Sequence, residues 1–173
     1  MAKSTYAKNF THGTITLTGG ATPTPLTLVL DCDNGDISVT GLVRGLHEVI
    51  KYERRGLLKS VARGNRIYPS GGMTIIMAQF TDAGAGTVSD FLTAKVGSAY
   101  AARVGTLGTG RPDAIDIGIS IEGTDFGDDF DHAFTMEDCR VSLDFAEGDP
   151  DQFSLSWEVM GDITGDLAYS QTT

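Results

Sequence analysis

Residues 141–161, VSLDFAEGDPDQFSLSWEVMG, alternate apolar and polar side chains on both sides of an acidic centre. Alternation with a period of two is typical of β-strands that bury one face and expose the other. In the centre, Pro150 has no backbone N–H to donate and Gly148 tolerates a positive φ, as a tight connection requires. The stretch therefore predicts two antiparallel strands joined by a turn, with Trp157 and Phe145 on the core side.

The same alternation recurs along most of the chain. Residues 115–121 alternate isoleucine with short polar side chains or glycine, and similar runs occupy 14–18, 26–31 and 37–41. We also expect a strand over 47–54, within the basic segment, and a buried strand over 71–80. Glycine and proline separate these runs, as expected of turns between strands. The sequence therefore predicts a mainly β fold.

One segment departs from this pattern. Thr87 stands three residues ahead of Asp90, which is the spacing of a helix N-terminal capping box. The apolar residues that follow, Val88, Phe91 and Val96 among them, are spaced to cover one side of a helix. We expect a helix over about 87–97.

The size of the chain favours a single domain. A length of 173 residues is enough for one core, so we expect one unit over 1–173. No run reaches the roughly 18 apolar residues of a membrane helix, and the first residues lack a signal-peptide core, which favours folding in the cytoplasm. The two cysteines, Cys32 and Cys139, lack metal-ligand spacing and are expected to be buried thiols. Segments 1–9 and 161–173 lack a strong pattern and are expected to be flexible until a neighbour orders them.

Charge is distributed unevenly. The net charge of −10 argues against tight binding of nucleic acid. Residues 44–66 nevertheless hold seven of the thirteen basic side chains, whereas residues 113–166 hold sixteen of the twenty-three acidic ones and a single base. Two interpretations follow: both regions face water, or copies of the chain stack with the basic segment of one against the acidic surface of the next.

Motifs for catalysis and cofactor binding are not found. The stretch GISIEG places Ser120 in mid-strand, and GTLGTGR has neither Rossmann nor phosphate-loop spacing. The three histidines lack zinc spacing, and DCDNGD (31–36) does not fit a calcium loop. We therefore expect no enzyme activity, no cofactor and no metal.

An acidic loop, DFGDDFDHAF (125–134), leaves three readings open: a bound cation, a contact with a basic neighbour, or a solvated loop. Its carboxylates are those of Asp125, Asp128, Asp129 and Asp131.

The order of these features resembles the major tail tube protein of long-tailed, siphovirus-like bacteriophages. The resemblance rests on a β domain, a charged arm between early strands, a mid-chain helix and the ending EDCRVSLDFAEGDPDQFSLSWEVMGDITG. It implies two packed antiparallel sheets, a β-sandwich or barrel, flanked by one α-helix. It also implies hexameric rings that stack into the tail tube of the virion, assembled in the host cytoplasm. The partners would be further copies of the chain and other tail proteins, namely tape measure, tail terminator and distal tail protein.

The resemblance also suggests roles for charged residues. An extended basic arm over 44–72 would contact a neighbouring subunit or ring, through Arg54, Arg55, Lys59, Arg63 and Arg66. Its acidic counter-surface would comprise Asp125, Asp128, Asp129, Asp131, Glu147, Asp149 and Asp151. The lumen would be lined by Asp116, Glu122, Asp144 and Glu158, so that DNA slides through without lasting phosphate contacts.

A β-sandwich binding module for carbohydrate or a cell surface is the alternative. Such a module needs an exposed aromatic platform, and alternation places Trp157, the single tryptophan, in the core.

Overall fold

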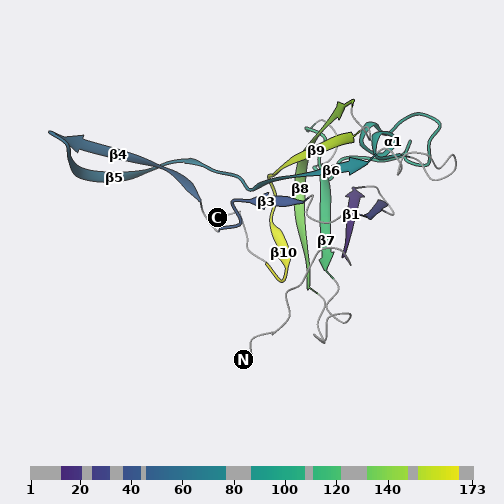
Figure 1. Cartoon of the computed structure of the whole chain (residues 1–173), viewed down its shortest axis with the longest axis horizontal. Helices are drawn as coiled ribbons and strands as arrows, with labels where there is room; N and C mark the ends of the chain where they lie inside the picture. The colour runs from purple at the N-terminus through teal and green to yellow at the C-terminus, as the bar shows by residue number, and fades with distance from the viewer. Residues whose placement is uncertain are drawn as a thin grey trace, which may run out of the picture.

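The computed structural model describes residues 13–20, 25–31, 37–43, 46–76, 87–107, 111–121, 132–147 and 152–167. It confirms a mainly β, antiparallel fold with one helix, in which a twisted sheet forms the body and a long hairpin projects from it (Figure 1). The elements are β1 (Gly13–Gly19), β2 (Leu26–Asp31), β3 (Ser38–Thr40), β4 (His47–Arg54), β5 (Leu57–Arg66), β6 (Ser70–Ile76), α1 (Val88–Thr93), β7 (Ile115–Ile121), β8 (His132–Ala146), β9 (Gln152–Val159) and β10 (Ile163–Gly165).

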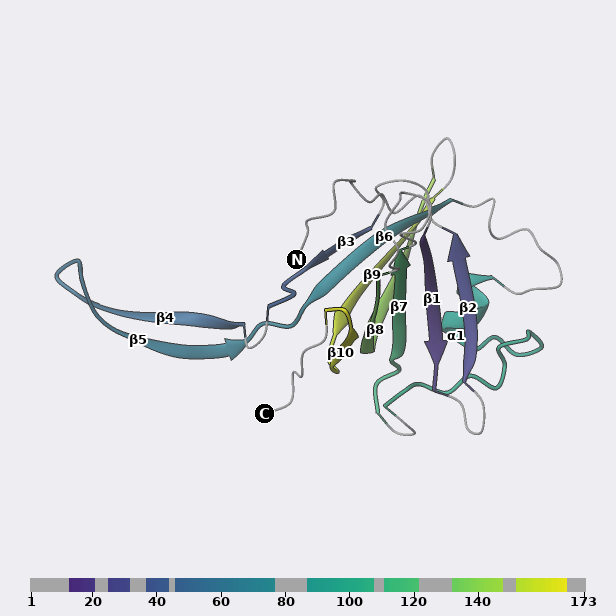
Figure 2. The ribbon, with the colours of Figure 1, turned by 90° about the horizontal axis from the view of Figure 1, so that it is seen from below.

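The body is one eight-stranded sheet. Its strands follow the order β2-β1-β7-β8-β9-β6-β3, and β10 pairs with β8 beside this path (Figure 2). The two packed sheets implied by the resemblance are thus replaced by a single sheet, and the second sheet is the separate β4–β5 hairpin.

The sheet bends at a β-bulge in β8. Ile115 pairs with Cys139 but Ile117 pairs with Met136, so two residues of β8, Glu137 and Asp138, lie between these pairs. Asp138 has a φ of 52°, and a bulge of this kind bends its strand. The first part of β8 pairs with β7 and residues 139–146 pair with β9, so the strand belongs to both halves of the sheet.

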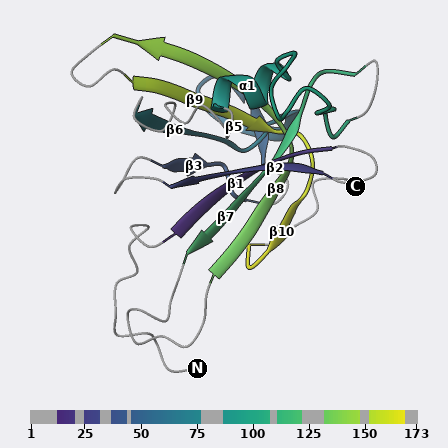
Figure 3. The same cartoon turned by 90° about the vertical axis from the view of Figure 1, so that its right-hand side faces the viewer.

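Both halves of the sheet bury side chains in one core. It includes Ile15, Leu17, Ile117, Met136, Leu155 and Trp157, as their alternation predicts. Phe145 differs: its side chain is 57% exposed, because β8 and β9 continue past the core. The arrangement in Figure 3 shows the β8–β9 end projecting beyond the rest of the sheet.

Helix α1 is shorter than expected. Thr87 and Asp90 form the predicted capping box, with Asp90 N–H donating to Thr87 Oγ1 at 3.1 Å. The helix ends at Ala94, which has a φ of 47°, and Val96 is 94% exposed instead of covering the sheet. The prediction of 87–97 was therefore wrong at its C-terminal end.

A buried arginine holds the end of this helix in place. Arg103 Nε donates to the carbonyl oxygen of Phe91 at 2.5 Å, and Nη2 donates to that of Leu92 at 2.7 Å. The same guanidinium pairs with Asp113 and lies 5.3 Å from the centre of the Phe91 ring. Sequence patterns gave no indication of this role, because the partners come from two separate segments, the end of α1 and Asp113.

Part of the segment 161–173 forms a strand, contrary to expectation. Strand β10 pairs with β8, with Ile163 opposite Met136, and the Ile163 side chain is buried in the core. Residues 168–173 lie outside the described residues. Among the helices of the described ranges, none has the length and apolar character needed to cross a membrane.

Candidate assembly surfaces

The β4–β5 hairpin lies within the predicted basic arm, 44–72. Its strands pair with each other and form a sheet separate from the body (Figure 1). Arg55 and Gly56 form the turn and both have positive φ, 53° and 74°, as a type I′ turn requires. A two-stranded hairpin that stands alone is marginally stable in water. The hairpin therefore needs a partner surface to be held firmly.

Apolar side chains are exposed on both faces of the hairpin. We call one the tyrosine face, where Ile50, Tyr52 and Leu57 lie on the same side as Arg54. On the opposite side, the valine face, Val49, Leu58 and Val61 alternate with the charged Lys51, Glu53 and Arg63. The six apolar side chains are 42% to 68% exposed. Exposed apolar area of this extent is typical of an interaction surface.

The hairpin is basic and the remainder of the chain is acidic. Residues 47–66 carry six Lys or Arg and two Glu, a net charge of +4, which leaves −14 for the rest of the chain. Four of the five predicted arm residues are exposed, namely Arg54, Arg55, Lys59 and Arg63. The fifth, Arg66, is half-buried and lies 5.2 Å from the centre of the Tyr68 ring.

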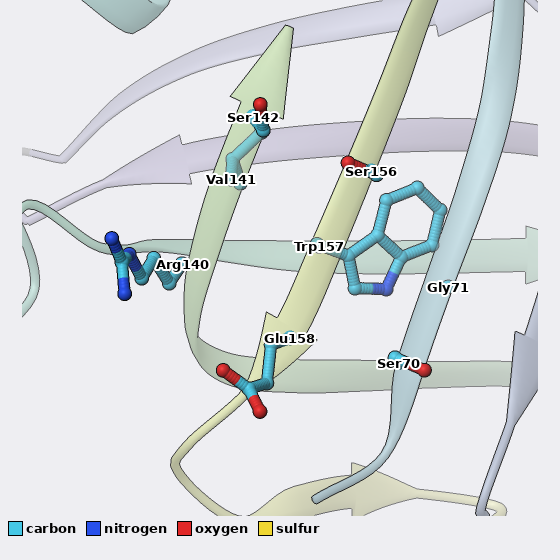
Figure 4. Close-up of a pocket in the computed structure, with 8 residues that line it drawn as sticks. All are labelled: Ser70, Gly71, Arg140, Val141, Ser142, Ser156, Trp157 and Glu158. Carbon is cyan, nitrogen blue, oxygen red and sulfur yellow. The ribbon is translucent and has the colours of Figure 1, made fainter.

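The polar face of the sheet is built from short side chains. Across β8, β9 and β6, Arg140 lies beside Glu158 and Ser70, and the next rows are Ser142, Ser156 and Gly72, then Asp144, Ser154 and Thr74. A shallow depression of about 550 Å³ lies here, bordered by residues of these strands (Figure 4). Asp144 and Glu158, two of the predicted lumen acids, are exposed on this face. Arg140, the single base of residues 113–166, adds a positive charge to this face.

Asp116 has a structural role that was not predicted. Its side chain is half-buried, and Oδ1 accepts a hydrogen bond from Asp138 N–H at 3.0 Å. Asp138 Oδ1 in turn accepts from Thr106 Oγ1 at 2.6 Å. Asp116 thus satisfies the extra backbone N–H of the bulge at the bend of β8.

Acidic side chains are crowded around this bulge. Burial raises the pKa of Asp116; the hydrogen bond from Asp138 N–H opposes this shift, and repulsion from the Asp138 carboxylate adds to it. Burial also raises the pKa of Glu137, with added repulsion from Asp116, Asp162 and Asp138. Within the residues that the structure describes, no group of three or more His, Cys, Asp or Glu is arranged to hold a metal ion.

The remaining acidic candidates are mostly outside the described residues. These are Glu122, Asp125, Asp128, Asp129, Asp131, Asp149 and Asp151. Glu147 is described and is exposed directly after β8.

No family model matches the chain, and no curated protein matches it. It is similar to a chain in the cryo-EM structure of the anti-feeding prophage (AFP) baseplate, 6-fold symmetrised, with 11% identity, a TM-score of 0.49 and coverage of 100% of both chains. A likeness at this level carries no argument about function.

Proposed function

We propose that the chain is a non-enzymatic structural subunit that assembles with copies of itself into stacked rings, forming the tube of a phage tail or phage-tail-like particle. The observation that carries this proposal is the projecting β4–β5 hairpin, which exposes apolar side chains on both faces and a net positive charge. An exposed apolar surface of that kind is typical of a site that binds another molecule.

A second copy of the chain fits the charge of the hairpin. The body of each copy is strongly acidic, so attraction between the hairpin of one copy and the body of the next sets orientation and speeds encounter. The hairpin and the body are different surfaces, which makes the contact heterologous. Heterologous contacts produce closed rings when the rotation closes and filaments when it does not.

The sheet offers a second means of assembly at its edges. Strands β2 and β3 stand at opposite ends of the strand order (Figure 2). Edge strands present backbone N–H and C=O groups that can pair with another chain. Pairing of β2 in one subunit with β3 in the next would continue the sheet around a ring, and we propose six subunits per ring.

In such a ring the polar face of the sheet would line the lumen. Its serine and threonine side chains are short, and Asp144 and Glu158 repel the DNA phosphates. Arg140 is the single Lys or Arg on β6, β8 and β9, which keeps the number of lasting phosphate contacts low. Tape measure, tail terminator and distal tail proteins are the further partners that this role requires.

The proposal is tested by assembly of the purified chain. Gel filtration and negative-stain electron microscopy over a range of concentrations should show rings or tubes. A strict monomer at every concentration would overturn the proposal.

The hairpin is tested by reversing the charge at its tip. The variant R54E/R55E should assemble poorly and keep the circular dichroism spectrum of the parent, because both residues are exposed. Arg111→Glu, an exposed position on the body, is the control and should assemble normally. Normal assembly of R54E/R55E would rule out a docking role for the hairpin tip.

A further inference from the structure

The projecting end of the β8–β9 pair carries an exposed aromatic patch. Phe145 and Phe153 lie directly opposite each other, and their ring centroids are 5.2 Å apart. Phe153 is half-buried against the sheet, whereas Phe145 is largely exposed. Outside residues 47–68, Phe145 is the one exposed aromatic side chain of the described residues. The exposed carboxylate of Glu147 follows two residues later, directly after the end of β8, whereas Asp144 belongs to the opposite, polar face.

We propose that this patch, formed by Phe145, Phe153 and Glu147, is the docking site for the tyrosine face of the β4–β5 hairpin of a second copy. The inference rests on the proposed function and specifies which two surfaces meet.

The two surfaces are complementary in chemistry. The tyrosine face presents Ile50, Tyr52 and Leu57 in sequence toward the tip, where Arg54 lies opposite Leu57. Aromatic rings gain energy from contact with other rings and with arginine. With the apolar side chains over Phe145 and Phe153, the arginines at the tip come within reach of a carboxylate. Buried aromatic and arginine side chains are the usual hot spots of interfaces.

The valine face is a poorer match to this patch. There Val49 lies opposite Arg63, Lys51 opposite Val61, and Glu53 opposite Leu58. Placing this face on two phenylalanine rings would bury charged groups without partners, which is costly. The pattern of charges therefore selects the tyrosine face for the aromatic patch.

The hairpin cannot reach the aromatic patch of its own chain. In Figure 1 the hairpin extends to one side of the body, while the β8–β9 end projects in another direction. The eight residues of β4 span about 27 Å at the usual rise of a strand, so the tip lies well away from the body. The occupant of the patch is consequently a hairpin from a different molecule.

Cross-linking between two single-cysteine variants tests the contact directly. In a Cys32→Ser background, one chain carries Ser60→Cys, opposite Tyr52 on the hairpin, and the other carries Ala146→Cys, next to Phe145. The remaining Cys139 is fully buried and stays unreactive. The two chains are mixed, assembled and treated with a short bis-maleimide. A dimer should form in the mixture and be absent when either chain is assembled alone.

Substitution of the patch gives an independent measurement. Phe145→Ser should raise the concentration needed for assembly by about tenfold or more, as expected for loss of an interface hot spot. Val96→Ser is the matched control, because Val96 is also exposed and lies far along the chain from the patch. Both variants should retain the fluorescence of the buried Trp157, which reports an intact fold.

An exchange of charges between the two surfaces is the third test. Glu147→Arg in the R54E/R55E chain should restore part of the lost assembly, because the exchanged charges attract again.

The outcomes separate the two proposals. Normal tubes without the mixed cross-link, together with normal assembly of Phe145→Ser, would overturn the docking site and leave the proposed function standing. Failure of the unmodified chain to assemble would overturn both.

Discussion

Replacement of Arg103 by methionine is the substitution whose cost to the fold is best defined. The Arg103 side chain is 2% exposed and its guanidinium donates to the carbonyls of Phe91 and Leu92 at the end of α1, as well as to Asp113. Methionine has a similar apolar stem, so the change removes the hydrogen bonds and leaves little empty space. We expect R103M to fold and to be destabilised.

The magnitude follows from the partners. A hydrogen bond from a charged donor contributes about 1.5–3 kcal/mol when its acceptor is buried. The Phe91 carbonyl also accepts from Ala94 N–H at 3.3 Å, so part of its bonding survives. Asp113 is 56% exposed, so its ion pair adds less than about 1 kcal/mol. Removing a guanidinium from a buried position recovers some desolvation energy, and we expect a net loss of about 3 kcal/mol in the free energy of unfolding.

The measurement is urea unfolding at a concentration where the chain is monomeric, followed by the fluorescence of Trp157, the single tryptophan. Asp113→Asn should cost about 1 kcal/mol or less, because that carboxylate is largely solvated. Arg111→Met, at an exposed position, should stay within about 0.5 kcal/mol of the parent. A loss below about 1 kcal/mol for R103M, with an unchanged m-value, would refute the view that this guanidinium fixes the helix end.

Two further substitutions test the sheet. Gly71→Ala would place a Cβ 2.6 Å from the Trp157 ring and 2.7 Å from the Ser38 carbonyl oxygen. We therefore expect the free energy of unfolding in urea to fall by about 1–3 kcal/mol. A variant as stable as the parent would show instead that β3 and β6 move apart at little cost. Asp116→Asn keeps an oxygen acceptor for Asp138 N–H but cannot ionise. Since burial raises the Asp116 pKa, the folded parent binds this proton more tightly than the unfolded chain, and its stability falls as pH rises through the folded pKa. The stability of D116N relative to the parent should therefore increase between about pH 4 and pH 7.5 in paired urea titrations, and a constant difference would contradict the assignment.

Local alternation was sufficient to predict the strands that pass through the core. Ile117, Leu155 and Trp157 are buried as expected, because each belongs to a strand with one face on the core. The same rule was wrong for Phe145, since alternation indicates which side of a strand a residue occupies but not where the core ends. It was also incomplete for Asp116, because the bulge that the carboxylate supports lies in a different strand.

The ends of elements depended on interactions that sequence patterns do not contain. Helix α1 ends at Ala94, and Arg103, nine residues further along the chain, donates hydrogen bonds to carbonyl groups of its last turn. Strand β10 has three residues, too few for a period to be visible, and is fixed by its pairing with β8. The strand predicted at 47–54 in the basic arm is confirmed by β4, but its pairing with β5 and the two apolar faces emerged only with the register of the two strands.

The long strand β8 has a consequence for how the body comes apart. Because its 15 residues supply hydrogen-bond partners to β7 and β10 on one part and to β9 on the other, neither half of the sheet can open without depriving the other of its neighbour. Local opening in such a structure spreads through the shared strand, which favours all-or-none unfolding of the body over separate melting of its halves. A subunit that unfolds in this way keeps its whole body folded until the body unfolds in a single step.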